Sequence, residues 1–360
     1  MAGIQNVADE LNDFPHPNPL PQVGEGTNVL FHLRDKESTN IAIIGGGYAG
    51  MAAAVELTSR GIAVTVFESA KQLGGRARGV VYNDTQLDNG QHLLLGCYRE
   101  TLRLIELVGG NLEQDFLRLP LQLDLHGQFS LKAPRLPAPL HLLIALLNAQ
   151  GLTWRVPKPM IPLQGSTLIA QSIRKLTALV PKIHVTVGYK GAMLAQHGQD
   201  ANLSLKLWEP LCIAALNTPI HKASAQVLLN VLRDALNQKR ADSDMLLPRL
   251  DFTALFPQHA AAFIEQRGGK VMLSTGVEKI ELRDASVALS TEHGTQIFSH
   301  VICATQPSVA AKLLNDIAPD SVAKIAALEQ QPIYTVYVQY PEHVSLPCPM
   351  LGLHQRASQW

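Results

Sequence analysis

Three glycines and one glutamate near the start of the chain have types and a spacing suited to binding phosphate and ribose. Gly45, Gly47 and Gly50 fit the pattern G-x-G-x-x-G, and Glu68 follows roughly twenty residues beyond them. A glycine turn lets the backbone approach a pyrophosphate, and the free N–H groups of a following helix attract the phosphate charge. A carboxylate after the next strand accepts hydrogen bonds from ribose hydroxyls and repels a 2′-phosphate. The pattern predicts a dinucleotide site that disfavours NADP.

The elements around these residues must be a strand, a turn, a helix and a second strand, in that order. Ile41–Ile44 is a short apolar run typical of a buried parallel strand, and Ala63–Phe67 is a second one that ends just before Glu68. Between them, Met51–Arg60 is rich in Ala, Leu and Glu, which favours a helix, and Gly61 ends it. This order predicts an α/β fold with a Rossmann-type dinucleotide-binding domain. The alternative is a glycine-rich turn in another kind of α/β protein, which would not require the whole ordered set.

A second pair of glycines follows Glu68 closely, in the run Leu73–Arg76. Paired glycines suit a second backbone approach to phosphate, and an arginine balances the phosphate charge. This Glu-x5-Gly-Gly-Arg pattern resembles the FAD-dependent amine oxidase and phytoene desaturase superfamily. The resemblance implies non-covalently held FAD, with the backbone near Val277 against the adenine. The residues expected to bind FAD are Gly45, Gly47, Tyr48, Ala49, Gly50, Glu68, Gly74, Gly75, Arg76 and Val277.

Two further motifs narrow the resemblance to one branch of that superfamily. Leu87–His92 reads LDNGQH, and LWEPL at Leu207–Leu211 is followed by ALNTP at Ala215–Pro219. Together they resemble the squalene-associated branch, the hydroxysqualene dehydroxylases of bacterial hopanoid synthesis. That resemblance implies a C30 isoprenoid substrate. It also implies that reduced FAD replaces the hydroxyl of hydroxysqualene by hydrogen, giving squalene and water.

The loss of a hydroxyl from an allylic carbon requires an acid, and the resulting cation must be kept from water. The resemblance puts the turn at Asp88–His92 beside the flavin ring, so His92 is the first candidate acid and Asp88 the second. The alternative for His92 is a structural role in capping a buried turn. Glu209 is a less favoured acid, because a structural role in its own helix is the simpler interpretation. An apolar tunnel for the substrate is reasonable, since each buried methylene contributes about 0.8 kcal/mol.

Two other classes of function remain open at this point. One is a carotenoid-type, phytoene-like desaturase or isomerase that uses FAD in the oxidative direction. The other is an inactive, truncated flavoprotein fragment, because related enzymes carry a late strand, a Gly-Asp pair and a helix that faces the flavin. We expect that carboxyl-terminal flavin segment to be missing from this chain. An amine oxidase is disfavoured because aromatic residues make up 5% of the chain and no aromatic cage for an amine is evident.

Composition excludes several kinds of partner. The chain has 30 Lys and Arg against 30 Asp and Glu, so no basic field favours nucleic acid. Its 4 cysteines are widely spaced, which argues against a zinc site or a disulfide framework. Leu140–Leu147 is strongly apolar but far shorter than the about 20 residues needed to span a bilayer. We expect a cytoplasmic protein in which this run is a core helix. The alternatives are peripheral contact with the inner face of the plasma membrane and contact with other squalene-pathway enzymes.

The chain is expected to divide into a leader and two discontinuous domains. Residues 1–39 contain a proline-rich stretch without helical or strand period and are expected to be a disordered leader, for which an over-extended start is one explanation and a docking arm the alternative interpretation. The FAD-binding domain is expected at 40–110 and 262–318. An inserted, mainly helical α+β substrate domain is expected at 111–261 and 319–360. Further elements are expected as helices at Ser166–Leu179, Gly191–Gln196, Leu203–Ala215 and Ala223–Leu236, and as strands at Leu119–Leu125 and Ile333–Tyr340.

Overall fold

The computed structural model describes residues 39–138, 140–151, 204–236 and 239–353. From residue 40 onward these belong to one structural unit. All but the last residue of the expected leader, and the helices expected at 166–179 and 191–196, lie outside the described residues. Within the described part of the chain, no helix is both long enough and apolar enough to cross a bilayer.

The central element is a parallel four-stranded sheet. β1 (Asn40–Ile44) pairs with β2 (Ala63–Phe67) on one side and with β14 (His300–Cys303) on the other. β10 (Lys270–Met272) pairs with β2, which gives the order β10-β2-β1-β14. Both strands predicted around the glycine turn are therefore present. The sheet takes strands from two stretches of chain separated by some two hundred residues of other structure.

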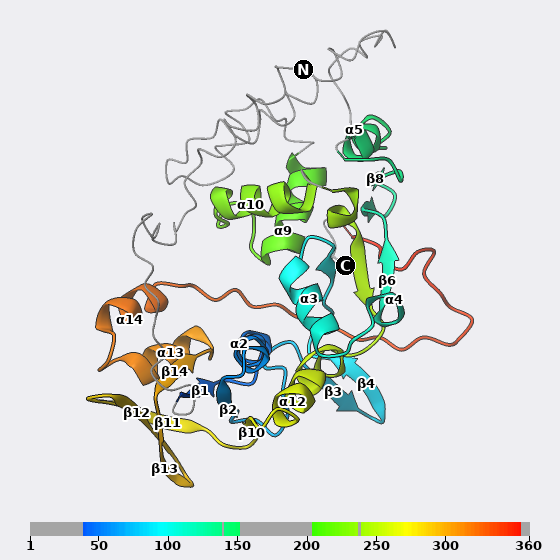
Figure 1. The fold of residues 1–360 in the computed structure, drawn as a ribbon. Helices are drawn as coiled ribbons and strands as arrows, with labels where there is room; N and C mark the ends of the chain where they lie inside the picture. Colours follow the sequence, from blue (N-terminus) through cyan, green and yellow to red (C-terminus); the bar gives the residue numbers. More distant parts are fainter. Residues whose placement is uncertain (1–38, 139, 152–203, 237–238, 354–360) are drawn as a thin grey trace, which may run out of the picture. The chain divides into compact units, whose positions relative to one another are not determined.

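Both faces of β1 are buried, because successive residues of a strand point to opposite sides. Ile43 faces a core shared with α2 (Tyr48–Ser59) and α12 (Pro257–Glu265), and Ile44 faces the core on the other side of the sheet. Figure 1 shows α2 and the antiparallel strands β11 to β13 on either side of β1. α2 begins at Tyr48 rather than at Met51 as the sequence predicted, so its N-terminus directly follows the glycine turn.

An antiparallel meander covers the second face of the sheet. It consists of β11 (Val277–Arg283), β12 (Ser286–Thr291) and β13 (Gly294–Phe298). The ring of Phe298 meets that of Phe67 edge-on, with 5.7 Å between the ring centroids, and this contact fixes the meander to the sheet. Two helices then follow β14, namely α13 (Pro307–Leu314) and α14 (Pro319–Ala326).

The other described elements are short strands and helices. The strands form the hairpins β3 (Gly79–Tyr82) with β4 (Thr85–Asp88) and β7 (Gln122–Leu125) with β8 (Phe129–Lys132), and the sheet β5 (Leu94–Leu95), β9 (Met245–Pro248), β6 (Phe116–Leu119). The α-helices are α3 (Arg99–Leu107), α4 (Leu112–Asp115), α5 (Leu140–Leu147), α9 (Glu209–Leu216), α10 (Ala225–Leu236) and α11 (Phe252–Leu255). The π-helical turn is η1 (Ser204–Trp208), and the 3₁₀ turn is η2 (Arg240–Ser243).

Prolines explain two differences from the elements expected from sequence. The strand expected at Leu119–Leu125 is divided into β6 and β7 at Pro120, which has no N–H to donate to a ladder. The helix expected at Leu203–Ala215 is divided into η1 and α9. Pro210 lies in the first turn of α9, where its missing N–H is tolerated.

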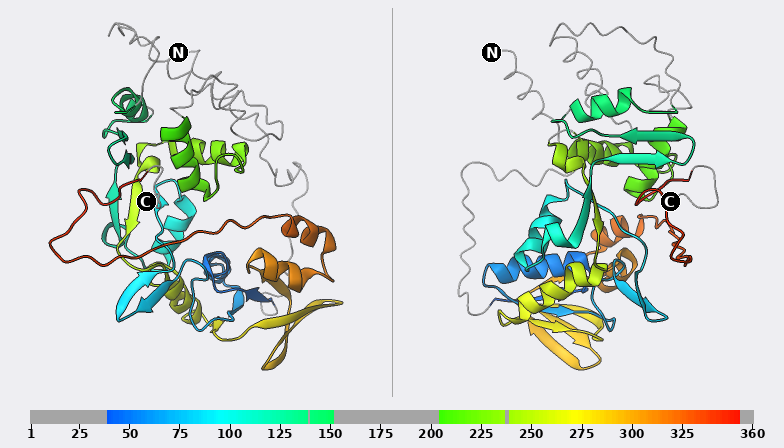
Figure 2. Two further views of the ribbon diagram at one scale, coloured as in Figure 1. Left: turned by 180° about the vertical axis from the view of Figure 1, so that it is seen from behind. Right: turned by 90° about the vertical axis from the view of Figure 1, so that its right-hand side faces the viewer.

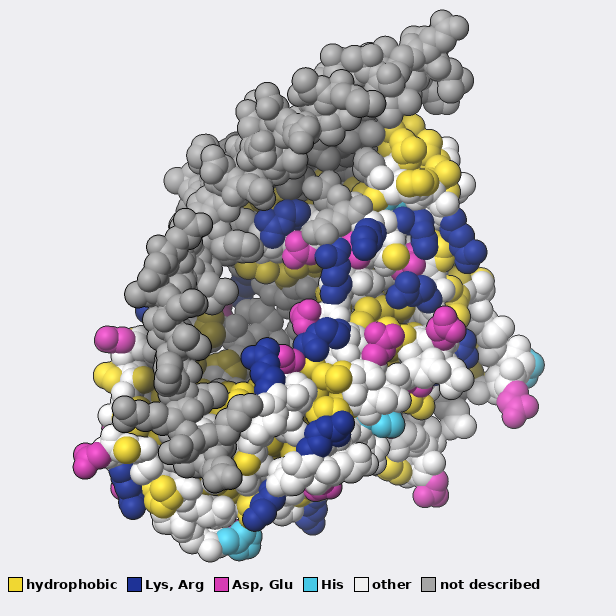
Figure 3. Space-filling model, viewed as in Figure 1, with side chains coloured by type: hydrophobic (Ala, Val, Ile, Leu, Met, Phe, Trp, Pro, Cys, Tyr) yellow, Lys and Arg dark blue, Asp and Glu magenta, His cyan; other side chains and the backbone are white. Residues whose placement is uncertain are grey.

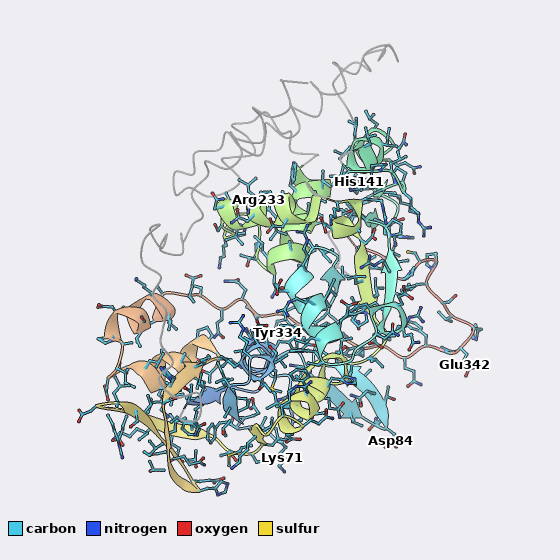
Figure 4. All side chains as sticks on the ribbon, in the orientation of Figure 1. Lys71, Asp84, His141, Arg233, Tyr334 and Glu342 are labelled. Atoms are coloured by element: carbon cyan, nitrogen blue, oxygen red, sulfur yellow. The ribbon has the colours of Figure 1, made fainter. Side chains whose placement is uncertain are left out.

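The strand expected at Ile333–Tyr340 is wrong. This segment is extended, and Figure 2 shows the orange-to-red chain running on after α14, but it pairs with no other strand among the described residues. Its side chains are open to solvent, and Tyr334, labelled in Figure 4, is 89% exposed. β-branched and aromatic residues favour an extended chain, but a strand also needs a neighbour for its backbone hydrogen bonds. The chain makes such a contact again at Gly352, which lies parallel beside Leu125.

Candidate functional site

The two glycine turns predicted to bind phosphate lie side by side. The N–H of Gly74 donates to the carbonyl oxygen of Gly46 over 2.9 Å, and Gly47 forms a parallel bridge with Gly74. A Cβ atom on Gly47 would meet no protein atom closer than the Cα of Gly75, at 3.8 Å. A Cβ on Gly50, by contrast, would collide with the carbonyl of Gly45. Gly50 is thus required by the close packing of helix and strand, whereas Gly47 leaves an open space between the two turns.

The open space lies at the N-terminus of α2, where backbone N–H groups have no partner within the helix. The N-cap residue is Gly47, so no side chain caps these groups, and the first turn carries no acidic residue. The Arg76 side chain is exposed next to the second turn and makes no ion pair with the described residues. Free N–H groups, a helix dipole and a guanidinium together suit the two charges of a pyrophosphate.

Glu68 lies beside the first glycine turn, with its carboxylate held by protein donors. One carboxylate oxygen accepts from the N–H of Gly46 over 2.6 Å, and the other accepts from the N–H of Ala70 over 2.8 Å. The side chain is only 9% exposed. A carboxylate oxygen accepts more than one hydrogen bond, so each oxygen keeps capacity for a ribose hydroxyl.

The segment just before Val277 is hydrogen-bonded to the segment that starts at Glu68. The carbonyl of Glu68 accepts from the N–H of Thr275 over 2.8 Å, and that of Ala70 accepts from Ser274. Val277 is half-buried and packs on the core that contains Phe67. The structure therefore brings the residues predicted for the AMP half of FAD to one end of the sheet. Their features suit a dinucleotide: open space at Gly47, uncapped N–H groups at the start of α2, and the buried carboxylate of Glu68. Binding itself stays a prediction.

Asp88 and His92 both contact one buried aromatic residue, Phe252, the first at its backbone and the second at its ring. Asp88 Oδ1 accepts a hydrogen bond from the Phe252 N–H over 2.8 Å. The ring of Phe252, which is 5% exposed, lies 4.6 Å from the His92 ring between centroids. Nδ1 of His92 is buried and has no hydrogen-bond partner among the described residues. The turn between β4 and β5 thus presents two groups able to hold a proton.

The surroundings of Asp88 raise the pKa of its carboxyl. Burial raises the pKa of the Asp88 carboxyl above its ordinary value, and the nearby carboxylate of Asp251 raises it further. The Phe252 N–H and His92 oppose this rise without cancelling it. Asp251 itself is the N-cap of α11 and accepts from the N–H groups of Thr253 and Ala254. Two carboxyl groups, those of Asp88 and Asp251, therefore accept hydrogen bonds at the start of one short helix.

Sequence reasoning missed three residues that contact this cluster. Phe252 carries no motif and lies 164 positions after Asp88. Tyr48 was predicted only to bind cofactor, but its hydroxyl donates to the Phe252 carbonyl over 2.7 Å. The hydroxyl of Tyr337 donates to the Asp88 carbonyl over 2.9 Å. Glu209, the less favoured acid, lies in the first turn of α9, which packs on η1 and α10.

Comparison with known proteins finds two family models that match parts of the chain. Residues 43–106 match the model of an NAD(P)-binding Rossmann-like domain, and residues 231–358 match that of flavin containing amine oxidoreductases. A hydroxysqualene dehydroxylase from Sinorhizobium fredii is 27% identical over 292 residues, covering 76% of this chain and 63% of the relative. A zeta-carotene desaturase from Arabidopsis thaliana is 26% identical over 290 residues, covering 74% of this chain and 46% of the relative. The chain thus spans less than two thirds of the length of these relatives.

Solved structures share the fold at low sequence identity. An oxidoreductase from Methanosarcina mazei has a TM-score of 0.58 at 16% identity, covering 81% of this chain and 66% of the other. Cyclohexylamine oxidase from Brevibacterium oxydans has a TM-score of 0.52 at 17% identity, covering 81% and 63%. The mixed α/β architecture, the paired glycine turns and the two matched models agree. These similarities support assignment of the chain to the superfamily of FAD-dependent amine oxidases and phytoene-type desaturases.

Proposed function

We propose that this chain is part of an FAD-dependent oxidoreductase that converts hydroxysqualene to squalene. The observation that carries the proposal is the contact of both Asp88 and His92 with Phe252, at a place where burial raises the pKa of the Asp88 carboxyl. Reductive removal of a hydroxyl needs a proton donor for the departing oxygen, whereas introducing a double bond into a hydrocarbon does not. Similarity to hydroxysqualene dehydroxylases from several bacteria supports the same substrate class.

Each residue then has a definite task in the reaction. When bound, reduced FAD supplies the hydride that takes the place of the hydroxyl. The glycine turns and Arg76 hold the pyrophosphate, and Glu68 accepts from the ribose. The carboxyl of Asp88 gives its proton to the hydroxyl, which leaves as water, and its Oδ1 stays bonded to the Phe252 N–H. His92 is the alternative donor, through its partnerless Nδ1.

Substitution of the two candidate acids tests the proposal. In Asp88→Asn the acidic proton is lost but the bond to Phe252 remains, so we expect bound flavin to be retained and turnover of hydroxysqualene by reduced enzyme to fall about a hundredfold. His92→Gln reports on the alternative donor in the same assay. The matched control is Asp84→Asn, at the tip of the same hairpin and labelled in Figure 4, where asparagine also tolerates the positive φ of 58°. Full turnover in both variants would refute the assignment of the acid.

A carotenoid-type desaturase is the second candidate function, favoured by the similarity to zeta-carotene desaturases. Two incubations separate the candidate functions. A desaturase converts phytoene when the enzyme is oxidised, whereas a dehydroxylase converts hydroxysqualene when the enzyme is reduced. Conversion of phytoene without conversion of hydroxysqualene would replace our proposal. A purified chain without flavin absorbance would instead support the inactive fragment.

We propose in addition that the protein meets a membrane surface at α5 to collect its apolar substrate. Leu140 and Leu147 of this helix and Leu136 before it are exposed, and Figure 3 shows apolar side chains gathered there. Apolar side chains of this kind insert into the boundary of the headgroup region. Flotation with liposomes tests the contact, and Leu140→Glu with Leu147→Glu should abolish it. Unchanged flotation of that variant would rule out α5 as the contact.

A further inference from the structure

Phe252 joins three segments that are far apart in sequence. Its ring packs on His92, its N–H donates to the Asp88 carboxylate, and its carbonyl accepts from the Tyr48 hydroxyl. We propose that Phe252, held by Tyr48, is a positioning residue that fixes Asp88 and His92 relative to the phosphate-binding turn. This inference rests on the proposed function, because it assigns the residue that orients the proposed proton donors.

The hold of Tyr48 on Phe252 is rigid. The Tyr48 ring lies 5.6 Å from that of Phe252 and 5.4 Å from that of Phe256, so it is packed between two aromatic side chains. Burial, with help from Asp88 and Asp251, raises the pKa of the Tyr48 hydroxyl above its ordinary value. The hydroxyl therefore keeps its proton at physiological pH and donates to the Phe252 carbonyl over 2.7 Å.

This link connects the acids to both glycine turns. Tyr48 is the first residue of α2 and directly follows Gly47, where the pyrophosphate is expected. The second turn is reached through Thr253, whose hydroxyl donates to the carbonyl of Leu73 over 3.2 Å and accepts from the N–H of Gly79. The start of α11 is thus hydrogen-bonded to Tyr48 within the first phosphate-binding turn, to Leu73 just before the second, and to Asp88. Such an arrangement transmits the position of the cofactor end to the proton donors.

The alternative is that Phe252 is an ordinary core residue. Two variants separate the ideas. Tyr48→Phe deletes one hydroxyl and keeps the ring packing, and Phe252→Leu deletes the ring and keeps the N–H that binds Asp88. Tyr82→Phe is the matched control, because it removes a hydroxyl from a side chain that is 67% exposed. We expect Phe252→Leu to lower kcat for hydroxysqualene about tenfold and Tyr48→Phe about fivefold, each with KM and bound flavin unchanged.

A spectroscopic readout makes the test independent of turnover. The protons of the His92 ring, assigned by comparison with His92→Gln in a histidine-labelled sample, report on the neighbouring aromatic ring by NMR. We expect both variants to move these signals, Tyr48→Phe included, because the Phe252 ring shifts when its carbonyl is released. Tyr82→Phe should leave them in place. Unmoved His92 signals in Tyr48→Phe and Phe252→Leu would overturn the positioning role, whatever the activity.

The failure of this inference is distinguishable from failure of the proposed function. If wild-type protein does not convert hydroxysqualene while the His92 signals respond to both variants, the substrate is wrong and the positioning role stands. If wild-type protein converts hydroxysqualene and both variants keep full kcat, the positioning role is refuted. Should Phe252→Leu fail to fold, Tyr48→Phe alone decides the question by the same two readouts.

Discussion

Replacing Gly47 by alanine should leave the protein folded and weaken the binding of FAD that we propose. The backbone at Gly47 has φ −77°, which any residue adopts, and the nearest atom to an added Cβ is 3.8 Å away. Alanine is a poorer N-cap than glycine, but it also lowers the entropy of the unfolded chain. The two effects roughly cancel, so the free energy of unfolding should change by less than about 1 kcal/mol. No clash within the protein opposes this substitution.

The cost appears when a pyrophosphate binds. The added methyl group occupies the space between the glycine turns and keeps phosphate oxygens from the hydrogen-bonding distance of about 2.9 Å to the N–H groups of α2. Losing one or two charge-assisted hydrogen bonds costs about 3 kcal/mol, which is more than a hundredfold in Kd. The assay is titration of the apoprotein with FAD followed by flavin fluorescence, together with thermal unfolding of the apoprotein.

Two other glycines provide matched controls with opposite outcomes. Gly61 lies just beyond α2 with φ +77° and nothing within 4 Å of an added Cβ. Gly61→Ala should therefore lower stability by about 1 kcal/mol through backbone strain while FAD binds normally. Gly50→Ala should prevent folding, because its Cβ would collide with the Gly45 carbonyl. Wild-type affinity for FAD in Gly47→Ala would refute the assignment of the open space to the pyrophosphate.

Two further predictions concern stability. Asp242 is 4% exposed and accepts from Arg99 over 2.9 Å and from the N–H of Lys239 over 2.8 Å. Asp242→Ala should therefore destabilise the fold by about 2 kcal/mol in urea unfolding, against no change for Asp84→Asn, which keeps a residue type that tolerates the positive φ of 58°. Burial, with Arg240, lowers the pKa of His141 below its ordinary value, so the folded state favours the neutral ring. The stability that the neutral His141 ring contributes is fully present above the pKa that histidine has in the unfolded chain. It is lost as the pH falls through the lower pKa of His141 in the folded protein. His141→Gln should make the free energy of unfolding less dependent on pH in this range, and an unchanged pH dependence would contradict the assignment.

The acid pair illustrates why the candidate site could be predicted only in part. The turn Asp88–His92 was found because its residue types stand together in the sequence and match a motif. Nothing nearby in the sequence pointed to Phe252. It is a single aromatic residue at the start of a four-residue helix, and such a residue looks the same in sequence as any aromatic residue of a core. Its importance comes from a hydrogen bond across 164 residues. Contacts of this kind depend on which distant segments of the chain pack together, and local hydrophobic periodicity carries no information about that.

The sequence by itself determined the local chemistry of the nucleotide site, because the order of apolar run, glycine turn, helix and acid is encoded within about thirty residues. The contact of Val277 with an adenine, which the superfamily resemblance implied, stays a prediction. The tertiary structure alone decided that the Tyr48 hydroxyl donates to the Phe252 carbonyl. It also decided that Ile333–Tyr340 is an extended segment that pairs with no strand among the described residues. The physical reason is the same in both cases. Hydrogen-bond partners are fixed by which distant segments pack together, and residue propensity sets only which local conformations are available.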